Sequence, residues 1–275
     1  MNIKLIATDV DGTLVADNHL TIPPINIKSL KMAKERNIKI AISTGRPYSL
    51  TDKESAELGG VDYLVLSNGA VVVDAKTLEV LYNCYLPLEQ LERIIPVFEN
   101  YPVVYEIYAD CQGYITQYTH DHYFDVDGLP RVFLEDYRER MLLCDDPYDI
   151  IRTKNVEKLN VDYMPKECID AIMEELKDIP DLVYSAGFQG NMEITAKGAD
   201  KGKALKWLTE KLSFEAENVM AFGDSANDVT MLKFAGYSYA MASGNQKAKD
   251  AAKYVTKLGN NEGGVGDTIK EVFGF

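Results

Sequence analysis

Two aspartates, Asp9 and Asp11, lie one residue apart directly after the apolar run 3–8. Residues two apart in an extended chain share one side, at roughly 7 Å between Cα atoms. Carboxylates this close repel each other unless one is protonated or a cation lies between them. A hard cation such as Mg²⁺ suits oxygen ligands of this kind. The pair is thus compatible with a metal-assisted site and equally with a capped strand end whose aspartates are solvated.

A second acidic group follows the apolar run 219–222. Asp224 lies just beyond this run, and Asn227 and Asp228 open the next predicted helix. Acidic residues often cap a helix start, which would account for Asp228. That explanation does not extend to Asp224 at the end of an apolar strand. Four carboxylates at two strand ends indicate a cation site.

Residues suited to a phosphoryl group lie elsewhere in the chain. Thr44 and Gly45 follow the apolar run 38–42, and their hydroxyl and backbone N–H could hold a phosphoryl oxygen. Lys201 lies at a predicted helix start, where a cation gains little from the helix dipole. A bound anion would explain it. Taken singly, the first pair is equally a turn, and Lys201 is equally a solvated surface lysine.

Some polar residues are predicted to play no chemical part or remain ambiguous. His19 is expected in a surface loop, and the pair His120 and His122 in a polar loop. Arg46 fits a substrate contact and a loop-bracing role equally well. For Lys197 a contact with substrate is neither indicated nor excluded.

Alternating strand and helix patterns must position these residues. The predicted strands are 3–8, 38–42, 63–66, 219–222, 237–241 and 254–256, and the predicted helices include 21–35, 201–212 and 228–234. Such alternation implies right-handed crossovers and a mostly parallel sheet. Ligands of such sheets bind beyond the carboxyl ends of the strands. Residues 70–82 predict a hairpin that turns at Ala75 and Lys76.

The middle of the chain has a different pattern. It is rich in tyrosine, and it pairs two amphipathic helices, 88–100 and 166–177, with strand candidates at 103–109, 113–118, 156–163, 182–188 and 191–196. We therefore predict an α/β domain formed by residues 1–83 and 196–275. An α+β domain of residues 84–195 interrupts it.

Composition narrows the class of protein. The net charge of −14 argues against a nucleic-acid-binding protein and would repel an anionic substrate unless local cations or a metal reverse the field. No apolar run is long enough for a membrane span, and the N-terminus lacks a secretory signal pattern. The cysteines are widely spaced, at Cys84, Cys111, Cys144 and Cys168, which is typical of buried thiols in a reducing compartment. We expect a cytoplasmic protein.

Four motifs in chain order carry a family resemblance. D-V-D-G-T, S-T-G-R, the lysine of D-K-G-K-A-L and G-D-S-A-N-D-V-T-M resemble the four motifs of haloacid dehalogenase (HAD)-type phosphatases. The insert resembles the cap of the Cof-type sugar-phosphatase subfamily, and so does the C-terminal segment. One departure lies in Glu262-Gly263-Gly264: an acidic residue often stands directly before the second glycine, and here that position is Gly263. The resemblance implies a Rossmann-like HAD core with an inserted cap.

The resemblance also implies a role for each matching residue. Asp9 would attack phosphorus and form an aspartyl-phosphate, and Asp11 would act as acid and then as base. Asp9, the Asp11 carbonyl and Asp224 would hold Mg²⁺. The phosphoryl oxygens would be held by Thr44, Gly45, Lys201 and Asn227, and Asp228 would orient the metal's surroundings.

Three functions are compatible with this pattern. The first is Mg²⁺-dependent hydrolysis of phosphate monoesters of small metabolites, with sugar phosphates as the leading class. The second is a hexose phosphomutase, and the third is a phospho-acceptor signalling domain with slow turnover. The expected partner is a small phosphorylated metabolite, not nucleic acid or a membrane. The sequence leaves the oligomeric state open.

Overall fold

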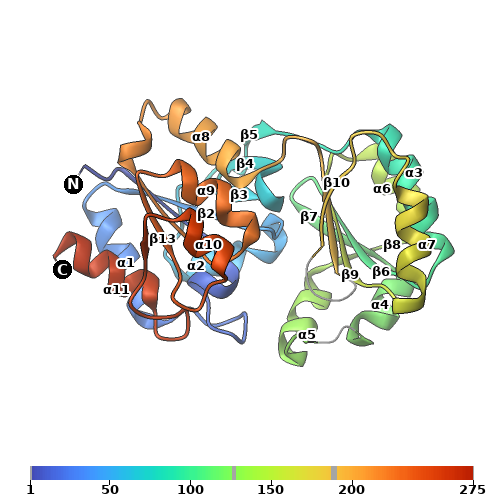
Figure 1. Ribbon diagram of the computed structural model, residues 1–275, viewed down its shortest axis with the longest axis horizontal. Coiled ribbons are helices and arrows are strands. Elements are labelled where there is room, and N and C mark those ends of the chain that lie inside the picture. Colours follow the sequence, from blue (N-terminus) through green and yellow to red (C-terminus); the bar gives the residue numbers. More distant parts are fainter. Residues whose placement is uncertain (1, 126–127, 187–190, 275) are drawn as a thin grey trace. The chain divides into compact units, whose positions relative to one another are not determined.

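The computed structural model describes residues 2–125, 128–186 and 191–274, except for the side chain of Ala186. The chain divides into two compact units (Figure 1). The first comprises the chain up to Arg46, Thr51–Asn83 and the chain from Asp200 onward. The second comprises Pro47–Leu50 and Cys84–Ala199.

The described part of the first unit contains an eight-stranded sheet in the order β14-β13-β12-β1-β2-β3-β4-β5. Its strands are β1 (Leu5–Thr8), β2 (Lys39–Ser43), β3 (Tyr63–Leu66), β4 (Val71–Asp74), β5 (Val80–Asn83), β12 (Val219–Gly223), β13 (Tyr237–Ala240) and β14 (Tyr254–Val255). Neighbouring strands from β14 to β3 are parallel, and β4 and β5 add antiparallel pairs. The predicted mostly parallel α/β core is confirmed.

Strand β1 lies between β12 and β2, and this order determines where the candidate site residues that follow these strands lie. Its last residue, Thr8, is in register with Phe222 on one side and Ile42 on the other. The chain therefore leaves all three strands at one edge of the sheet. Because the strand order changes direction at β1, this edge is the place where open α/β sheets bind ligands.

Helices of the first unit cover the sheet. They are α1 (Pro24–Glu35), α2 (Asp52–Glu57), α8 (Lys201–Lys211), α9 (Val229–Phe234), α10 (Gln246–Ala251) and α11 (Gly264–Phe273). Leu205 and Leu208 of α8 and Met231 of α9 join Leu5 and Val219 of the sheet in one buried cluster. This packing holds the start of α8 beside the end of β12. Helices α1 and α11 pack against each other (Figure 1).

The described part of the second unit contains a six-stranded sheet in the order β10-β11-β9-β6-β7-β8. Its strands are β6 (Val104–Ala109), β7 (Gln112–Thr116), β8 (Leu142–Cys144), β9 (Val156–Tyr163), β10 (Val183–Ala186) and β11 (Met192–Thr195). Its helices are α3 (Leu88–Asn100), α4 (Gln117–His122), α5 (Arg131–Arg140), α6 (Pro147–Thr153) and α7 (Lys166–Leu176). Phe98 of α3, Ile150 of α6 and Ile172 of α7 pack with Leu159 and Ile194 of the sheet.

Several local predictions for this unit are wrong. The strand candidate at 113–118 ends at Thr116, whose side chain accepts a hydrogen bond from Thr119 N and caps α4. His120 and His122 consequently lie in a helix, not in a loop. The sequence reading also missed α5, β8 and α6, although Asp146 caps α6 with its side chain. The end of the candidate 182–188 lies outside the described residues.

Two observations concern the chain as a whole. No helix within the described ranges combines the length and the apolar character that crossing a membrane requires. All four cysteines lie in the described ranges, and none forms a disulfide.

Candidate active site

Asp9 follows β1 and is buried, with 4% of its surface exposed. Its backbone N–H donates to Phe222 O at 3.0 Å, and its Oδ1 accepts from Lys201 Nζ at 2.8 Å. The chain then turns at Gly12, whose φ is +69°. A Cβ at Gly12 would lie 2.6 Å from Asp224 Oδ2. Glycine at this position lets the two acidic loops approach each other.

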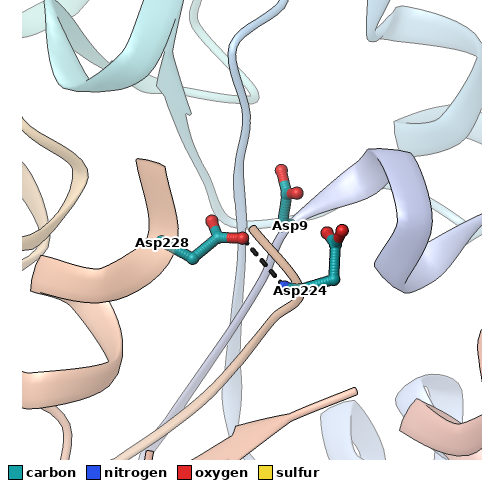
Figure 2. Close-up of side chains that lie close together, drawn as sticks. All are labelled: Asp9, Asp224 and Asp228. Atoms are coloured by element: carbon teal, nitrogen blue, oxygen red, sulfur yellow. Dashed lines mark hydrogen bonds between the residues drawn. The ribbon is translucent and has the colours of Figure 1, made fainter. Parts of the chain in front are cut away.

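Asp224 and Asp228 complete an acidic cluster with Asp9 (Figure 2). Asp228 Oδ2 accepts from the backbone N–H of Asp224 at 2.9 Å and of Ser225 at 3.1 Å. Its Oδ1 accepts from Lys201 Nζ at 2.7 Å. The hydroxyl of Thr13 donates to Asp224 Oδ1 at 3.0 Å. The loops after β1 and β12 are therefore tied together through side chains.

The acidic cluster has more negative than positive groups, which favours the binding of a cation. One oxygen each of Asp9, Asp224 and Asp228 lie within 4.8 Å of one another. Burial and then Asp228 raise the pKa of Asp9, and the same causes raise the pKa of Asp224 to about 7. Burial would lower the pKa of Lys201, but Asp228 and Asp9 raise it, so this side chain is an ammonium. Three carboxylates around one ammonium, all with oxygen donors, fit a divalent hard cation.

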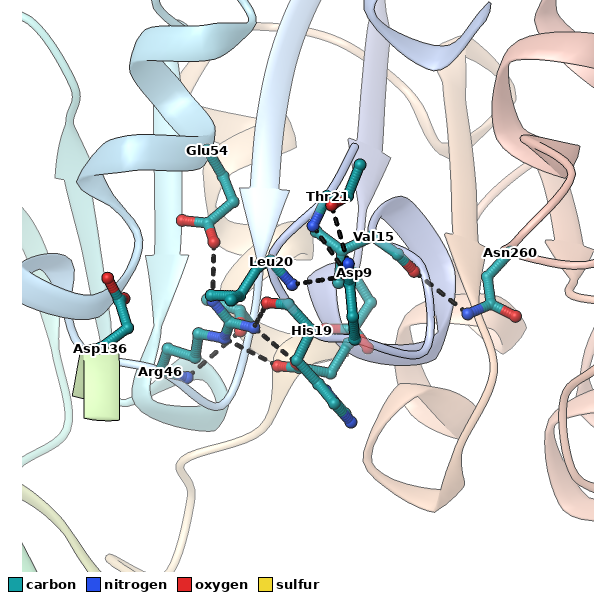
Figure 3. A network of polar contacts seen from close by, with 12 residues as sticks. Asp9, Val15, His19, Leu20, Thr21, Arg46, Glu54, Asp136 and Asn260 are labelled. Atoms are coloured by element: carbon teal, nitrogen blue, oxygen red, sulfur yellow. Dashed lines mark hydrogen bonds and ion pairs between the residues drawn. The ribbon is translucent and has the colours of Figure 1, made fainter. Parts of the chain in front are cut away.

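Asp11 has different partners from Asp9. Arg46 donates to it through Nε to Oδ2 at 2.8 Å and through Nη2 to Oδ1 at 2.5 Å. His19 Nδ1 lies 2.7 Å from Oδ1. Burial would raise the pKa of Asp11, but Arg46 and His19 hold that pKa well below its usual range. Arg46 also donates to Glu54 at 2.8 Å (Figure 3). Its guanidinium therefore contacts the carboxylates of both Asp11 and Glu54.

Of the residues predicted to hold a phosphoryl group, Lys201 opens α8, and the others lie in the loops after β2 and β12, which Asn68 in the loop after β3 links. Thr44 is buried at the end of β2, and its hydroxyl accepts from Arg46 N at 3.2 Å. The Thr44 carbonyl accepts from Asn68 N at 3.0 Å. Asn227 donates through Nδ2 to Asn68 Oδ1 at 3.0 Å. Gly45 lies half-buried in the same turn as Thr44.

Two sequence expectations change at this point, and the structure places two further residues. Lys201 needs no bound anion to explain it, because it is buried against Asp9 and Asp228. His19 does lie in a loop, but its ring contacts Asp11 instead of only solvent. Asn68 was assigned no role, although the Ser67-Asn68-Gly69 run at a strand end is a usable signal. Lys197 pairs with Asp181 on the surface of the second unit.

The sequence matches the haloacid dehalogenase-like hydrolase family over residues 6–269. The chain belongs to this family. A 5-amino-6-(5-phospho-D-ribitylamino)uracil phosphatase of Bacillus subtilis is 30% identical, over 98% of this chain and 96% of that protein. A second phosphatase of that name, from the same organism, is 28% identical over 98% and 97% of the two chains.

A solved structure agrees with this assignment. A haloacid dehalogenase-like hydrolase from Bacteroides thetaiotaomicron superposes with a TM-score of 0.82 at 26% identity, over 98% of this chain and 100% of that one. The predicted recognition, fold class and enzyme class are thereby confirmed. The protein is a HAD-type phosphatase.

Proposed function

We propose that this HAD-type phosphatase hydrolyses phosphate monoesters of small metabolites, sugar phosphates foremost, through a phosphorylated Asp9. The observation that carries this proposal is the position of Asp9. It lies at the carboxyl end of the central strand, in contact with Lys201 Nζ and within one acidic cluster with Asp224 and Asp228.

The reaction proceeds in two steps. A carboxylate oxygen of Asp9 attacks phosphorus, the bond from phosphorus to the ester oxygen breaks, and Asp11 gives a proton to the departing oxygen. Water then attacks phosphorus, the bond to Asp9 breaks, and Asp11 takes the proton of the water. Lys201 and Asn227, with Thr44 and the N–H of Gly45, hold the phosphoryl oxygens as charge is redistributed.

We assign the metal to Asp9, Asp224 and the Asp11 carbonyl. A bound Mg²⁺ would supply the positive charge that removes the repulsion between the carboxylates and the phosphate. Asp228 is assigned to orient Asp224, because both of its oxygens already accept hydrogen bonds from protein groups. The hard, all-oxygen donor set supports Mg²⁺ over softer metals.

The substrate assignment draws support from the relatives. The names of the two Bacillus proteins describe a phosphate monoester on a ribityl chain. A polyhydroxylated small molecule of that kind fits the metabolite class proposed here. We assign the enzyme to the cytoplasm, which the four cysteines outside any disulfide support.

A screen of phosphorylated metabolites for released inorganic phosphate tests the proposal. We expect turnover of several sugar phosphates with Mg²⁺ present and none in excess EDTA. Multiple turnovers of p-nitrophenyl phosphate would separate hydrolysis from a single phosphorylation event. A need for a sugar bisphosphate, with no phosphate released, would instead establish a phosphomutase and contradict the proposal.

A further inference from the structure

The loop that follows the two aspartates brings His19 to Asp11. His19 has a φ of +58°, in the left-handed region that a residue with a Cβ rarely adopts. In this conformation its ring Nδ1 lies 2.7 Å from Asp11 Oδ1. Its carbonyl accepts from Arg46 Nη2 at 3.2 Å. The side chain of His19 thus contacts Asp11, and its main chain contacts Arg46, the other partner of Asp11.

The rest of the loop fixes this conformation. His19 N donates to Ala16 O at 2.8 Å, and Ala16 N donates to Thr21 O at 2.9 Å, so the loop closes on itself. Asn260, which is 2% exposed, donates to Val15 O at 3.1 Å (Figure 3). The loop is therefore also held by contacts other than the His19 ring, one of them from the opposite end of the chain.

The His19 ring occupies one of the hydrogen-bond acceptor sites of the Asp11 carboxylate, as a count of these sites shows. An ionised carboxylate only accepts, so the ring nitrogen that faces it is assigned as N–H. Each carboxylate oxygen has two lone-pair sites. Oδ1 accepts from Arg46 Nη2 and His19 Nδ1 and is full. Oδ2 accepts from Arg46 Nε among the described residues, which leaves it one site.

We propose that His19 is a positioning residue for Asp11, which saturates Oδ1 so that Oδ2 is the oxygen that exchanges the proton. In the second step, the water oxygen bonds to phosphorus, the bond from phosphorus to Asp9 breaks, and the water proton goes to Asp11 Oδ2. In the first step, the same oxygen gives a proton to the departing ester oxygen; Asp11 takes that proton up when the anionic substrate binds beside it, because a nearby negative charge favours the protonated carboxyl. This inference rests on the function proposed above.

Two substitutions at position 19 isolate the contact. Glycine and asparagine both tolerate the positive φ, but only asparagine places an N–H donor near the position of ring Nδ1. His19→Gly therefore removes the contact without straining the loop, and His19→Asn retains it. Thermal unfolding midpoints of both variants check that the fold is intact.

Rapid-quench kinetics with p-nitrophenyl phosphate and saturating Mg²⁺ provide the readout. Nitrophenolate departs without much help from an acid, so the role of Asp11 falls mainly on the second step. For His19→Gly we expect kcat and KM to fall together by about 10- to 100-fold, with kcat/KM unchanged, below the full effect of losing acid–base catalysis. A burst of nitrophenolate and phosphorylated protein, seen by intact mass, should appear. His19→Asn should stay within about threefold of wild type.

Asn18→Gly is the matched control. The Asn18 side chain accepts from the N–H groups of Leu20 and Thr21, so its loss loosens the same loop while His19 remains. We expect no burst from this variant. A burst equal to that of His19→Gly would assign the effect to loop order and overturn the inference. So would a His19→Gly variant with unchanged kcat, or one whose kcat/KM falls as much as kcat.

Asp11→Asn separates this inference from the proposed function. It should accumulate the phosphorylated protein more strongly than any variant at position 19. If Asp11→Asn and wild type never carry phosphate, the proposed two-step reaction fails, and the role of His19 fails with it. If Asp11→Asn accumulates phosphorylated protein and His19→Gly does not, only the role of His19 is overturned.

Discussion

Three carboxylates, two buried and one half-buried, near one ammonium group are costly unless each charge has a partner. Lys201 meets this need by contacting Asp9 and Asp228 at once, while Thr13 donates to Asp224. The remaining negative charge is what a divalent cation would neutralise. At the scale of single residues, the site therefore combines a fixed ammonium with a place for a second, exchangeable positive charge.

Asp9→Asn tests the nucleophile. The amide is nearly isosteric with the carboxylate and can still accept from Lys201, so we expect an intact fold. It is too weak a nucleophile to form the acyl-phosphate, so turnover should be lost. The measurement is kcat for p-nitrophenyl phosphate, with circular dichroism to verify folding. More than a small residual fraction of wild-type kcat, in protein free of wild-type enzyme, would contradict the assignment.

Asp224→Ala tests the metal assignment. We expect the Mg²⁺ concentration for half-maximal activity to rise by at least about tenfold, because one of the charged ligands is lost. KM for substrate at saturating Mg²⁺ should change much less. Asp250→Ala is a suitable control, since it removes an exposed carboxylate and the same net charge from the same unit. Full activity of the wild type in excess EDTA would argue against any metal requirement.

Site residues that follow a strand could be predicted from the sequence more readily than site residues within loops. Asp9, Thr44 and Asp224 follow apolar runs, and parallel strands bring their carboxyl ends to one edge. His19 follows no such run, and the apolar run 63–66 before Asn68 was not used as a signal. Their placement depends on left-handed backbone conformations, with φ of +58° and +59°, that follow from contacts distant in the sequence. This is why sequence analysis alone assigned them no role.

At the scale of elements, the sheet of the second unit carries a buried polar group on β6 and β9. Glu106 accepts from the hydroxyls of Tyr108 and Tyr123 and from Asn160 Nδ2. Asp162 also accepts from Asn160, but its Oδ2 is buried with no hydrogen-bond partner among the described residues. Burial and then Glu106 raise the pKa of Asp162. Asp162 therefore holds a proton to higher pH in the folded protein than an ordinary aspartate does.

Asp162→Asn should stabilise the protein at neutral pH. In the unfolded chain this carboxyl ionises near its ordinary pKa of about 4, whereas the folded protein retains the proton to higher pH. Folded wild type therefore loses stability as pH rises above about 4, until the folded group also ionises. Asparagine resembles the neutral carboxyl and does not titrate.

Thermal unfolding between pH 4 and pH 8 measures this effect. The gain from Asp162→Asn should reach roughly 1–3 kcal/mol at the high end, the range for a buried group without a partner, and should shrink toward pH 4. Asp178→Asn, at an exposed position in the same unit, is the control and should show no such trend. Destabilisation of Asp162→Asn at every pH would mean that the carboxylate itself is required.

Element prediction succeeded where a repeat pattern was long enough to be read. The helix Leu88–Asn100 and the strand Val156–Tyr163 have the predicted bounds, because the helix buries one regular face and the strand is a long run that is buried over its first six residues. Strand β8 was missed since it has three residues and exposes Leu142 and Leu143. Helix α6 has seven residues, so its start depends on a cap more than on periodicity.

At the scale of the whole molecule, a net charge of −14 must still admit an anionic substrate. Lys201 and the cation that we propose would act locally, where burial makes charges effective, while distant surface charges are screened by salt. The order of motifs in the chain predicted a common site, because a parallel sheet joins distant segments at one edge. The sequence did not specify that β1 lies between β12 and β2, which depends on how the whole sheet assembles.

The last prediction concerns the insert, which we propose selects the substrate. Every residue assigned a chemical step belongs to the first unit, and those residues address only a phosphoryl group and a metal. They carry no information about the rest of the substrate. A separate unit that excludes water would also strengthen the charges that bind phosphate. Specificity is therefore assigned to residues 84–195.

An exchange of inserts tests this division. We replace residues 84–195 with the corresponding insert of the Bacillus subtilis phosphatase that is 30% identical. The chimera should gain activity on the compound for which that relative is named, and the reciprocal chimera should lose it. The Mg²⁺ requirement and the effect of Asp9→Asn should not change, because both belong to the first unit. A folded chimera that kept the substrate ranking of its parent would place specificity in the core, since the exchanged residues would then carry none.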